Sequence, residues 1–341
     1  MVLATQRVND HFLIKRARDG PPTLCADAAA QGSSAVSSIN ELRRLRGSQR
    51  DARQQNKAAF FFLLPWFIGL FGITLGPMLA SLYLSFTKYN LLQPPQFSGL
   101  DNWTRMVDDE RLHKSLEVTF SYVLVSVPLQ LAMALGLALL LDRGVRGLAF
   151  YRSVFYLPSL IGGSVAIAVL WRAMFGTNGL VNEALALVGI QGQGWISEPE
   201  TALSTLVVLN VWTFGSPMVI FLAGLRQIPT SLYEAASVDG AKHWRQFRSI
   251  TIPLLTPIIF FNLVLQIIHA FQTFTQAFVV SGGTGGPADS TLFFSLYLYQ
   301  RGFGHFDMGY ASALAWVLLL IVAAFTAVNF WASKYWVFYD D

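Results

Sequence analysis

The stretch VTFSYVLVSVPLQLAMALGLALLL (Val118–Leu141) contains no charged residue and is long enough to cross a membrane. About 20 apolar helical residues span the ~30 Å hydrocarbon core of a bilayer. Five more stretches lack Asp, Glu, Lys and Arg: Ala58–Thr87, Ser153–Trp171, Thr201–Leu225, Ser249–Ala288 and Met308–Ser333. Ser249–Ala288 is too long for one helix and must include loop, for which the glycine-rich segment 282–287 is suited. The sequence therefore predicts an all-α integral membrane protein with six transmembrane helices.

The composition indicates lipid rather than water as the main solvent. Of the 341 residues, 53% are hydrophobic and 13% are charged, whereas soluble proteins carry about 25% charged residues. Too few charges are present to cover a soluble surface, which excludes a soluble globular enzyme. The net charge of +4 is spread between the apolar stretches, so no nucleic-acid partner is expected. The single cysteine, Cys25, excludes a disulfide framework within the chain.

The distribution of positive charge predicts the orientation in the membrane, because Lys and Arg are enriched in cytoplasmic segments. With the N-terminus inside, about three quarters of the 24 Lys and Arg residues fall on the cytoplasmic side. Both termini are therefore expected in the cytoplasm, with residues 58–338 forming the membrane domain. Residues 1–57 form a basic tail for which two interpretations stay open: a partly disordered segment, or a helix on the membrane surface that contacts lipid.

The predicted cytoplasmic loop 226–256 has the pattern of a helical hairpin, and an ordinary amphipathic linker is the alternative that the residues alone leave open. A short helix is expected over Leu232–Val238, followed by Asp239-Gly240, where glycine readily adopts the left-handed backbone that ends a helix. A second helix is expected from Ala241 toward Ile250. Apolar residues recur every three positions on the face expected against the membrane domain: Trp244, Phe247 and Ile250. Two prolines are expected to end this helix before the fifth span: Pro253 and Pro257.

Within this loop, Glu234-Ala-Ala, Gly240 and Ile250-Thr-Ile-Pro253 resemble the EAA signature of permease subunits of bacterial ABC importers. The family pattern usually ends in Ile-x-Leu-Pro, so Ile252 is a mild departure of similar size. The resemblance implies that the loop is the coupling helix that sits in a groove of the ATPase subunit. It also implies that Glu234 faces basic groups of the ATPase and that Gly240 sets the bend. The residues that it assigns to coupling are Glu234, Ala235, Ala236, Gly240, Ile250 and Pro253.

The resemblance extends from about Ala59 to Phe338 and is strongest to carbohydrate-importer permeases of the maltose and glycerol-phosphate type. The segments that carry it are Phe97–Trp103 (FSGLDNW), Tyr151–Pro158 (YRSVFYLP), Asn210–Trp212 (NVW), Gly285–Pro287 (GGP) and Met308–Ala313 (MGYASA). It implies the type I ABC importer permease fold and a place in the bacterial plasma membrane. It also implies an assembly with a second six-span permease, with ATPase subunits that bind ATP and Mg, and with an extracytoplasmic solute-binding protein. No cofactor or metal is expected on this chain itself.

Polar side chains in the fifth uncharged stretch fall on one side of an expected helix. At 100° per residue they cover an arc of roughly 120°: Asn262, Gln266, His269, Gln272, Thr273 and Gln276. Such an arc should face protein or a water-filled cavity, because polar groups are costly in lipid. Amides and hydroxyls suit a sugar, whose hydroxyls both donate and accept. The alternative is that these groups only hydrogen-bond neighbouring helices.

Further groups are expected beside this arc. Three phenylalanines are placed to stack on sugar rings: Phe271, Phe274 and Phe278. In the fourth span, the resemblance assigns Asn210 to a segment that reaches sugar in the maltose permease, and Thr213 lies close by. The expected substrate-pathway residues are thus Asn210, Thr213, Gln266, His269, Gln272, Thr273 and Gln276.

No lysine follows a glycine, so the chain lacks a Walker A loop and any ATP hydrolysis is expected on other polypeptides. The expected function is half of the translocation pathway for a sugar or oligosaccharide in a binding-protein-dependent ABC importer. An importer for glycerol phosphate or another small polar solute stays open, although His269 is the only candidate cation in the spans. A secondary carrier is disfavoured because the spans lack carboxylates. A membrane-embedded enzyme is disfavoured because the 5 histidines are scattered.

Overall fold

The computed structural model describes residues 59–144 and 147–338. The chain divides into two compact units, Met1–Met78 and Leu79–Asp341. In the first unit the described residues are helical from residue 59 onward and include a π-helical segment, η1 (Gly69–Leu75). Helix α3 (Gly76–Ser85) continues into the second unit. The predicted N-terminal tail, residues 1–57, lies outside the described residues.

Six apolar spans are present in the described part of the chain, as the sequence predicted. Four are helical runs long enough to cross a membrane: Ala59–Ser85, α5 (Glu110–Asp142), His243–Val280 and α16 (Met308–Trp336). The other two are bent helix pairs: α6 (Leu148–Ile161) with α7 (Val165–Met174), and α9 (Pro199–Trp212) with α10 (Gly215–Leu225). The count is therefore confirmed, but the third and fourth predicted spans are not single straight helices.

The third span bends by 94° between α6 and α7. Gly162 and Gly163 occupy the bend. Glycine is a poor helix former, so the helix is easily interrupted at these two residues. Ser164 then begins α7 by accepting a 3.3 Å hydrogen bond from the Ile167 amide, which satisfies one of the free amides at the helix start.

The fourth span bends by 41° between α9 and α10. Gly215 begins α10 directly against helix α6. A Cβ at this position would lie 2.5 Å from the Phe155 carbonyl oxygen and 2.8 Å from the Ser159 hydroxyl oxygen. Only glycine therefore permits this approach of the two helices.

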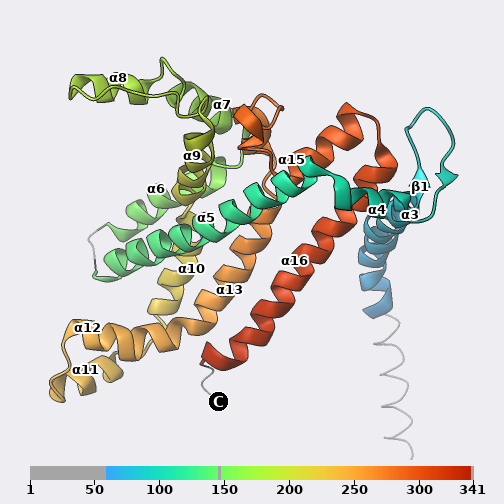
Figure 1. Cartoon of the computed structure of the whole chain (residues 1–341). Helices are drawn as coiled ribbons and strands as arrows, with labels where there is room; N and C mark the ends of the chain where they lie inside the picture. Colours follow the sequence, from blue (N-terminus) through green and yellow to red (C-terminus); the bar gives the residue numbers. More distant parts are fainter. Residues whose placement is uncertain (1–58, 145–146, 339–341) are drawn as a thin grey trace, which may run out of the picture. The chain divides into compact units, whose positions relative to one another are not determined.

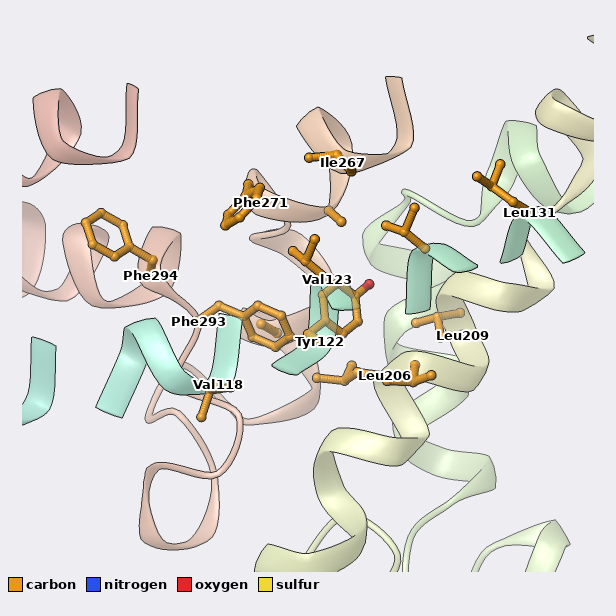
Figure 2. Close-up of a cluster of buried hydrophobic side chains, with 14 of the residues drawn as sticks. Val118, Tyr122, Val123, Leu131, Leu206, Leu209, Ile267, Phe271, Phe293 and Phe294 are labelled. Atoms are coloured by element: carbon orange, nitrogen blue, oxygen red, sulfur yellow. The ribbon is translucent and has the colours of Figure 1, made fainter. Parts of the chain in front are cut away.

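Helix α5 is the centre of the second unit. It packs against α9, α10, α13 (Ile252–Phe271) and α15 (Phe294–Tyr299). Figure 2 shows this core, in which side chains from all but α10 are labelled. The ring of Tyr122 on α5 meets the ring of Phe293 edge-on, with centroids 4.7 Å apart. Leu206 and Leu209 of α9 complete the cluster and are almost fully buried.

The loop 226–256 forms a helical hairpin, as the sequence predicted. Helix α11 (Thr230–Val238) is followed by α12 (His243–Gln246) and a π-helical turn, η3 (Phe247–Thr251), and the pair lies beyond the ends of α10 and α13 (Figure 1). We call this end of the second unit the hairpin face. The expectation that Pro253 and Pro257 end the helix is wrong, because the chain stays helical from His243 through both prolines to Phe271. Pro253 lies in the first turn of α13, where a missing amide proton costs little.

Short elements join the spans at the opposite end of the second unit, the far face. They are β1 (Thr87–Lys88) paired antiparallel with β2 (Gln96–Phe97), α4 (Asp101–Arg105), η2 (Met106–Asp108), α8 (Leu180–Leu187), η4 (Pro287–Asp289) and η5 (Gln300–Gly304). Asn102 ties them to α3, since its side-chain amide donates 2.9 Å hydrogen bonds to the carbonyl oxygens of Ser85 and Thr87.

Candidate substrate cavity and coupling hairpin

Three interrupted helices meet around one polar cavity of about 420 Å³. The interruptions fall at residues 162–164, 213–214 and 272–274. Backbone groups released from helical pairing are tolerated at membrane depth only where protein or a cavity satisfies them. The lining residues are Gln130, Ser159, Gly163, Asn210, Thr213, Ser216, Pro217, Gln266, His269, Gln272, Phe274, Thr273, Thr275 and Gln276.

All seven residues predicted for the substrate pathway lie on this cavity. The expectation of a single helix through residues 262–276 is wrong. Helix α13 ends at Phe271, and α14 (Thr275–Val280) begins after the interruption. Gln272 and Thr273 therefore reach the cavity from a non-helical segment. Their role in binding a substrate stays a prediction.

Three other residues of the predicted arrangement do not line the cavity: Asn262, Phe271 and Phe278. Asn262 is fully buried and does not line the cavity. Phe271 is buried between the rings of Phe120 and Phe325, at centroid distances of 5.4 and 5.2 Å, so it cannot stack on a sugar. Of the three phenylalanines only Phe274 lines the cavity, which leaves one aromatic face for a ligand.

The cavity is polar but lacks strong charge. None of its described lining residues is Asp, Glu, Lys or Arg, and His269 is the one titratable side chain among them. Amide and hydroxyl groups dominate the lining. Such groups hydrogen-bond a neutral, hydroxyl-rich molecule without the desolvation cost of a buried ion.

The polar lining residues missed in the sequence include Gln130 of α5 and Ser159 of α6. Gln130 is the only amide side chain in the stretch Val118–Leu141. An amide in an otherwise apolar span is a usable signal of a polar contact. Ser159 carries no such signal, because a serine is easily accommodated in a membrane helix by its own backbone.

The hairpin is closed by hydrogen bonds between its two arms. The Gln246 amide, almost fully buried, donates to the Ser237 hydroxyl at 2.9 Å and to the Ala241 carbonyl at 3.1 Å. The hydroxyls of Tyr233 and Thr251 lie 2.9 Å apart, within hydrogen-bond distance.

Gly240 makes the bend between the arms with the left-handed backbone that the sequence predicted, at φ 76°. The Ala241 amide donates to the Ala236 carbonyl at 2.8 Å, and the Gly240 amide donates to the Ser237 carbonyl at 3.1 Å. This pair of bonds is the Schellman ending of a helix.

The predicted coupling residues are divided between the surface and the base of the hairpin. Glu234, Ala235 and Gly240 are exposed, whereas Ala236, Ile250 and Pro253 are half-buried. The expectation that Trp244 faces the membrane domain is wrong, because its side chain is 72% exposed. Val238, beside the bend, is 89% exposed, so the hairpin presents apolar groups together with Glu234. Their contact with an ATPase stays a prediction.

A cluster of charged and phenolic side chains holds the far face together. Asp109 precedes α5, accepts a 3.2 Å hydrogen bond from the Leu112 amide, and accepts the hydroxyls of Tyr297 and Tyr310. Burial alone would raise the pKa of Asp109, but the hydrogen bonds from the two tyrosines and Leu112, with the charge of Arg301, hold this pKa below its ordinary value. The carboxylate is therefore ionised at neutral pH.

Two ion pairs flank this cluster. Arg105 of α4 lies 2.7 Å from Asp307, just before α16. Arg111 of α5 makes two hydrogen bonds, of 3.0 and 2.8 Å, to Asp289 of η4. These pairs join segments far apart in the sequence, which is why the sequence alone did not indicate them.

Six apolar spans with interruptions around a polar cavity define a multi-pass membrane permease. The chain belongs to the family described as the binding-protein-dependent transport system inner membrane component, which matches residues 118–336. It is therefore a membrane-spanning subunit of a transporter that depends on a binding protein. The secondary-carrier and membrane-enzyme alternatives are set aside by this membership.

Two curated relatives cover most of the chain. It is 54% identical over 294 residues to the probable ABC transporter permease protein YesP of Bacillus subtilis (strain 168), covering 86% of this chain and 95% of the relative. It is 35% identical over 264 residues to the lactose transport system permease protein LacF of Rhizobium radiobacter, covering 76% of this chain and 88% of the relative.

The fold is also similar to a solved structure. A chain of the crystal structure of a bacterial ABC transporter involved in the import of the acidic polysaccharide alginate superimposes with a TM-score of 0.72. The match covers 82% of this chain and 96% of that chain, at 22% identity. The predicted ABC importer permease fold is thus confirmed.

Proposed function

We propose that this chain forms half of the translocation pathway for a sugar or oligosaccharide, in an importer driven by ATP hydrolysis on separate subunits. The carrying observation is the cavity of about 420 Å³ lined by amides and hydroxyls. Its volume lies in the range of roughly 300–1,000 Å³ that holds small-molecule ligands. The relative LacF is named for lactose transport, which supports a carbohydrate as cargo.

Several cavity side chains have unused hydrogen-bonding groups. No described residue donates to or accepts from the side chains of Gln266, His269 and Gln272, which line the cavity. A sugar hydroxyl placed there finds donors and acceptors that no described residue occupies, and it takes the place of water. Phe274 supplies an apolar face for a ring. Glycerol phosphate is the weaker cargo, because its anionic group finds no Lys or Arg among the described lining residues.

The orientation and the partners follow from the same proposal. The hairpin face lies in the cytoplasm, together with both termini, and the far face meets an extracytoplasmic solute-binding protein. A second six-span permease supplies the other half of the pathway. The hairpin rests on ATPase subunits that bind ATP and Mg, and closure of the ATPase dimer moves the spans between inward-open and outward-open states.

Purification from native membranes, followed by uptake assays, tests the proposal. A tagged chain extracted in mild detergent is expected to bring with it a Walker-motif ATPase and a second six-span permease, identified by mass spectrometry. Vesicles containing that complex are expected to accumulate a labelled sugar only with ATP on the hairpin side and binding protein on the far side. A chain that purifies alone and transports without ATP would overturn the proposal.

A further inference from the structure

Gln130 lines the cavity, yet its amide is directed to the backbone of the fourth span. It is 2% exposed. Its Nε2 atom donates to the carbonyl oxygen of Thr213 at 3.2 Å and to the hydroxyl of Thr213 at 3.0 Å. Its Oε1 atom accepts from the side-chain amide of Asn210 at 3.3 Å. The hydrogen-bonding capacity of Gln130 is thus largely used within the protein.

Ser159 of α6 completes the same arrangement from the other side. Its hydroxyl donates to the Thr213 carbonyl at 2.8 Å and accepts from the Ser216 amide at 2.8 Å. The Thr213 carbonyl has no helical donor, because the residue four positions further on is Pro217, and the Ser216 amide lies in the first turn of α10. Ser159 and Gln130 replace those partners, so the bend has no unsatisfied group at this carbonyl.

Some other lining side chains also bond the protein, such as Gln276, whose amide donates to the Gly162 carbonyl at 3.3 Å, but others do not. Gln266 and Gln272 have the same amide group on the same cavity, but no described residue pairs with their side chains. The amides of the cavity therefore fall into two classes, those bound to the protein and those open to a ligand.

We propose that Gln130 and Ser159 are positioning residues that fix the fourth-span bend. Through it they place Asn210 and Ser216 on the cavity, while the cargo binds the unpaired amides. The effect on cargo rests on the proposed function, whereas the effect on the bend does not. Replacing Gln130 by an apolar residue of similar length leaves the Thr213 carbonyl with one donor and the Asn210 amide without its acceptor, and the bend loses its fixed angle.

The experiment measures the bend directly in the purified importer complex. Cys25→Ser removes the single cysteine, and Ser204→Cys with Ala223→Cys places spin labels on exposed positions of α9 and α10. The distance distribution between the labels is recorded by pulsed electron resonance. Gln130→Met is expected to broaden or shift this distribution, and Ser159→Ala to do so to a smaller extent.

Gln266→Met is the matched control, because it removes a cavity amide that has no described partner. It is expected to leave the distance distribution unchanged while lowering sugar uptake about tenfold. An unchanged distribution in both Gln130→Met and Ser159→Ala overturns the proposal. If Gln130→Met fails to assemble, Ser159→Ala decides alone. Absence of sugar uptake in every variant contradicts the proposed function, and the distance measurement still decides the role of Gln130.

Discussion

At the scale of single residues, the backbone at Gly240 has the most direct consequence for coupling. Its φ of 76° is unfavourable for residues with a side chain, while no other atom lies within 4 Å of the place a Cβ would take. A substitution there strains the backbone without causing a clash, so its effect is confined to the bend of the hairpin.

Gly240→Ala is expected to reduce ATP-driven uptake while membrane insertion stays normal, because the strain of roughly 1–2 kcal/mol falls on the hairpin bend. Gly99→Ala is the matched control, since Gly99 has φ 64°, has equally free space and lies on the far face. Uptake and ATPase rates are measured in the same vesicles. Equal loss of uptake in the two variants would show that the hairpin bend has no special role.

Asp109 provides a second prediction at this scale. Its folded-state pKa lies below the ordinary value, so its stabilisation is present above about pH 4 and is lost as the pH falls through the folded-state pKa. Asp109→Asn is expected to lower the unfolding free energy at pH 7 by about 1.5–3 kcal/mol, because the tyrosine hydrogen bonds lose their charged acceptor. Below pH 4 the difference from the native protein should shrink.

Thermal unfolding of the purified complex between pH 3 and pH 7 measures this effect. Asp101→Asn is the control, because the ion pair of Asp101 with Lys88, at 3.0 Å, is exposed on both sides and surface pairs contribute about 0–1 kcal/mol. A penalty for Asp109→Asn that is equally large at both ends of the pH range would contradict the account of its charge.

At the scale of the helices, the sequence predictions located the spans but none of the interruptions around the cavity. Lack of charge marks a span equally well whether its helix is straight or bent. The bend at Gly162 had a local signal in two adjacent glycines. The interruption at residues 272–274 had none, because it contains no glycine or proline. The helix ends directly after Phe271, whose ring packs against rings of α5 and α16. That packing is a tertiary contact, so the local sequence does not reveal it.

The contact between α6 and α10 yields a prediction for this scale. Gly215→Ala is expected to lower the melting temperature and the yield of assembled complex, since its Cβ meets the Phe155 carbonyl of α6. Gly136→Ala in α5 is the control, because that Cβ would meet no atom within 4 Å and alanine favours a helix over glycine by about 1 kcal/mol. A Gly215→Ala protein as stable as Gly136→Ala would contradict the close approach.

At the scale of the molecule, α5 connects the three functional regions of the second unit. Its 33 residues span about 50 Å. Its first turn is capped by Asp109 at the far face, and Gln130 lies on the cavity. At the hairpin face Asp142 lies 3.8 Å from Arg226, next to the hairpin. One continuous helix thus contacts the coupling region, the fourth-span bend and the far-face cluster.

The sequence predicted which kinds of residue line the candidate site, but it did not predict how those residues are held in place. Residues such as Gln266 and His269 were found because amides and imidazoles stand out in an apolar stretch. The sequence did not indicate that Gln130 is tied to Thr213, more than 80 residues away. It also did not show that Asn262, on the same predicted side, is buried away from the cavity. Both depend on how the helices pack.

The central claim is that cargo crosses the membrane along the unpaired amides of this cavity. The most direct measurement is the initial rate of labelled-sugar uptake into vesicles that contain the complete importer, with the ATPase rate recorded alongside. Gln266→Met combined with Gln272→Met is expected to lower uptake about tenfold or more, while ATPase stimulation by the loaded binding protein persists. Gln96→Met, exposed on the far face, should leave both rates unchanged. Uptake at the native rate in the double variant would contradict the claim.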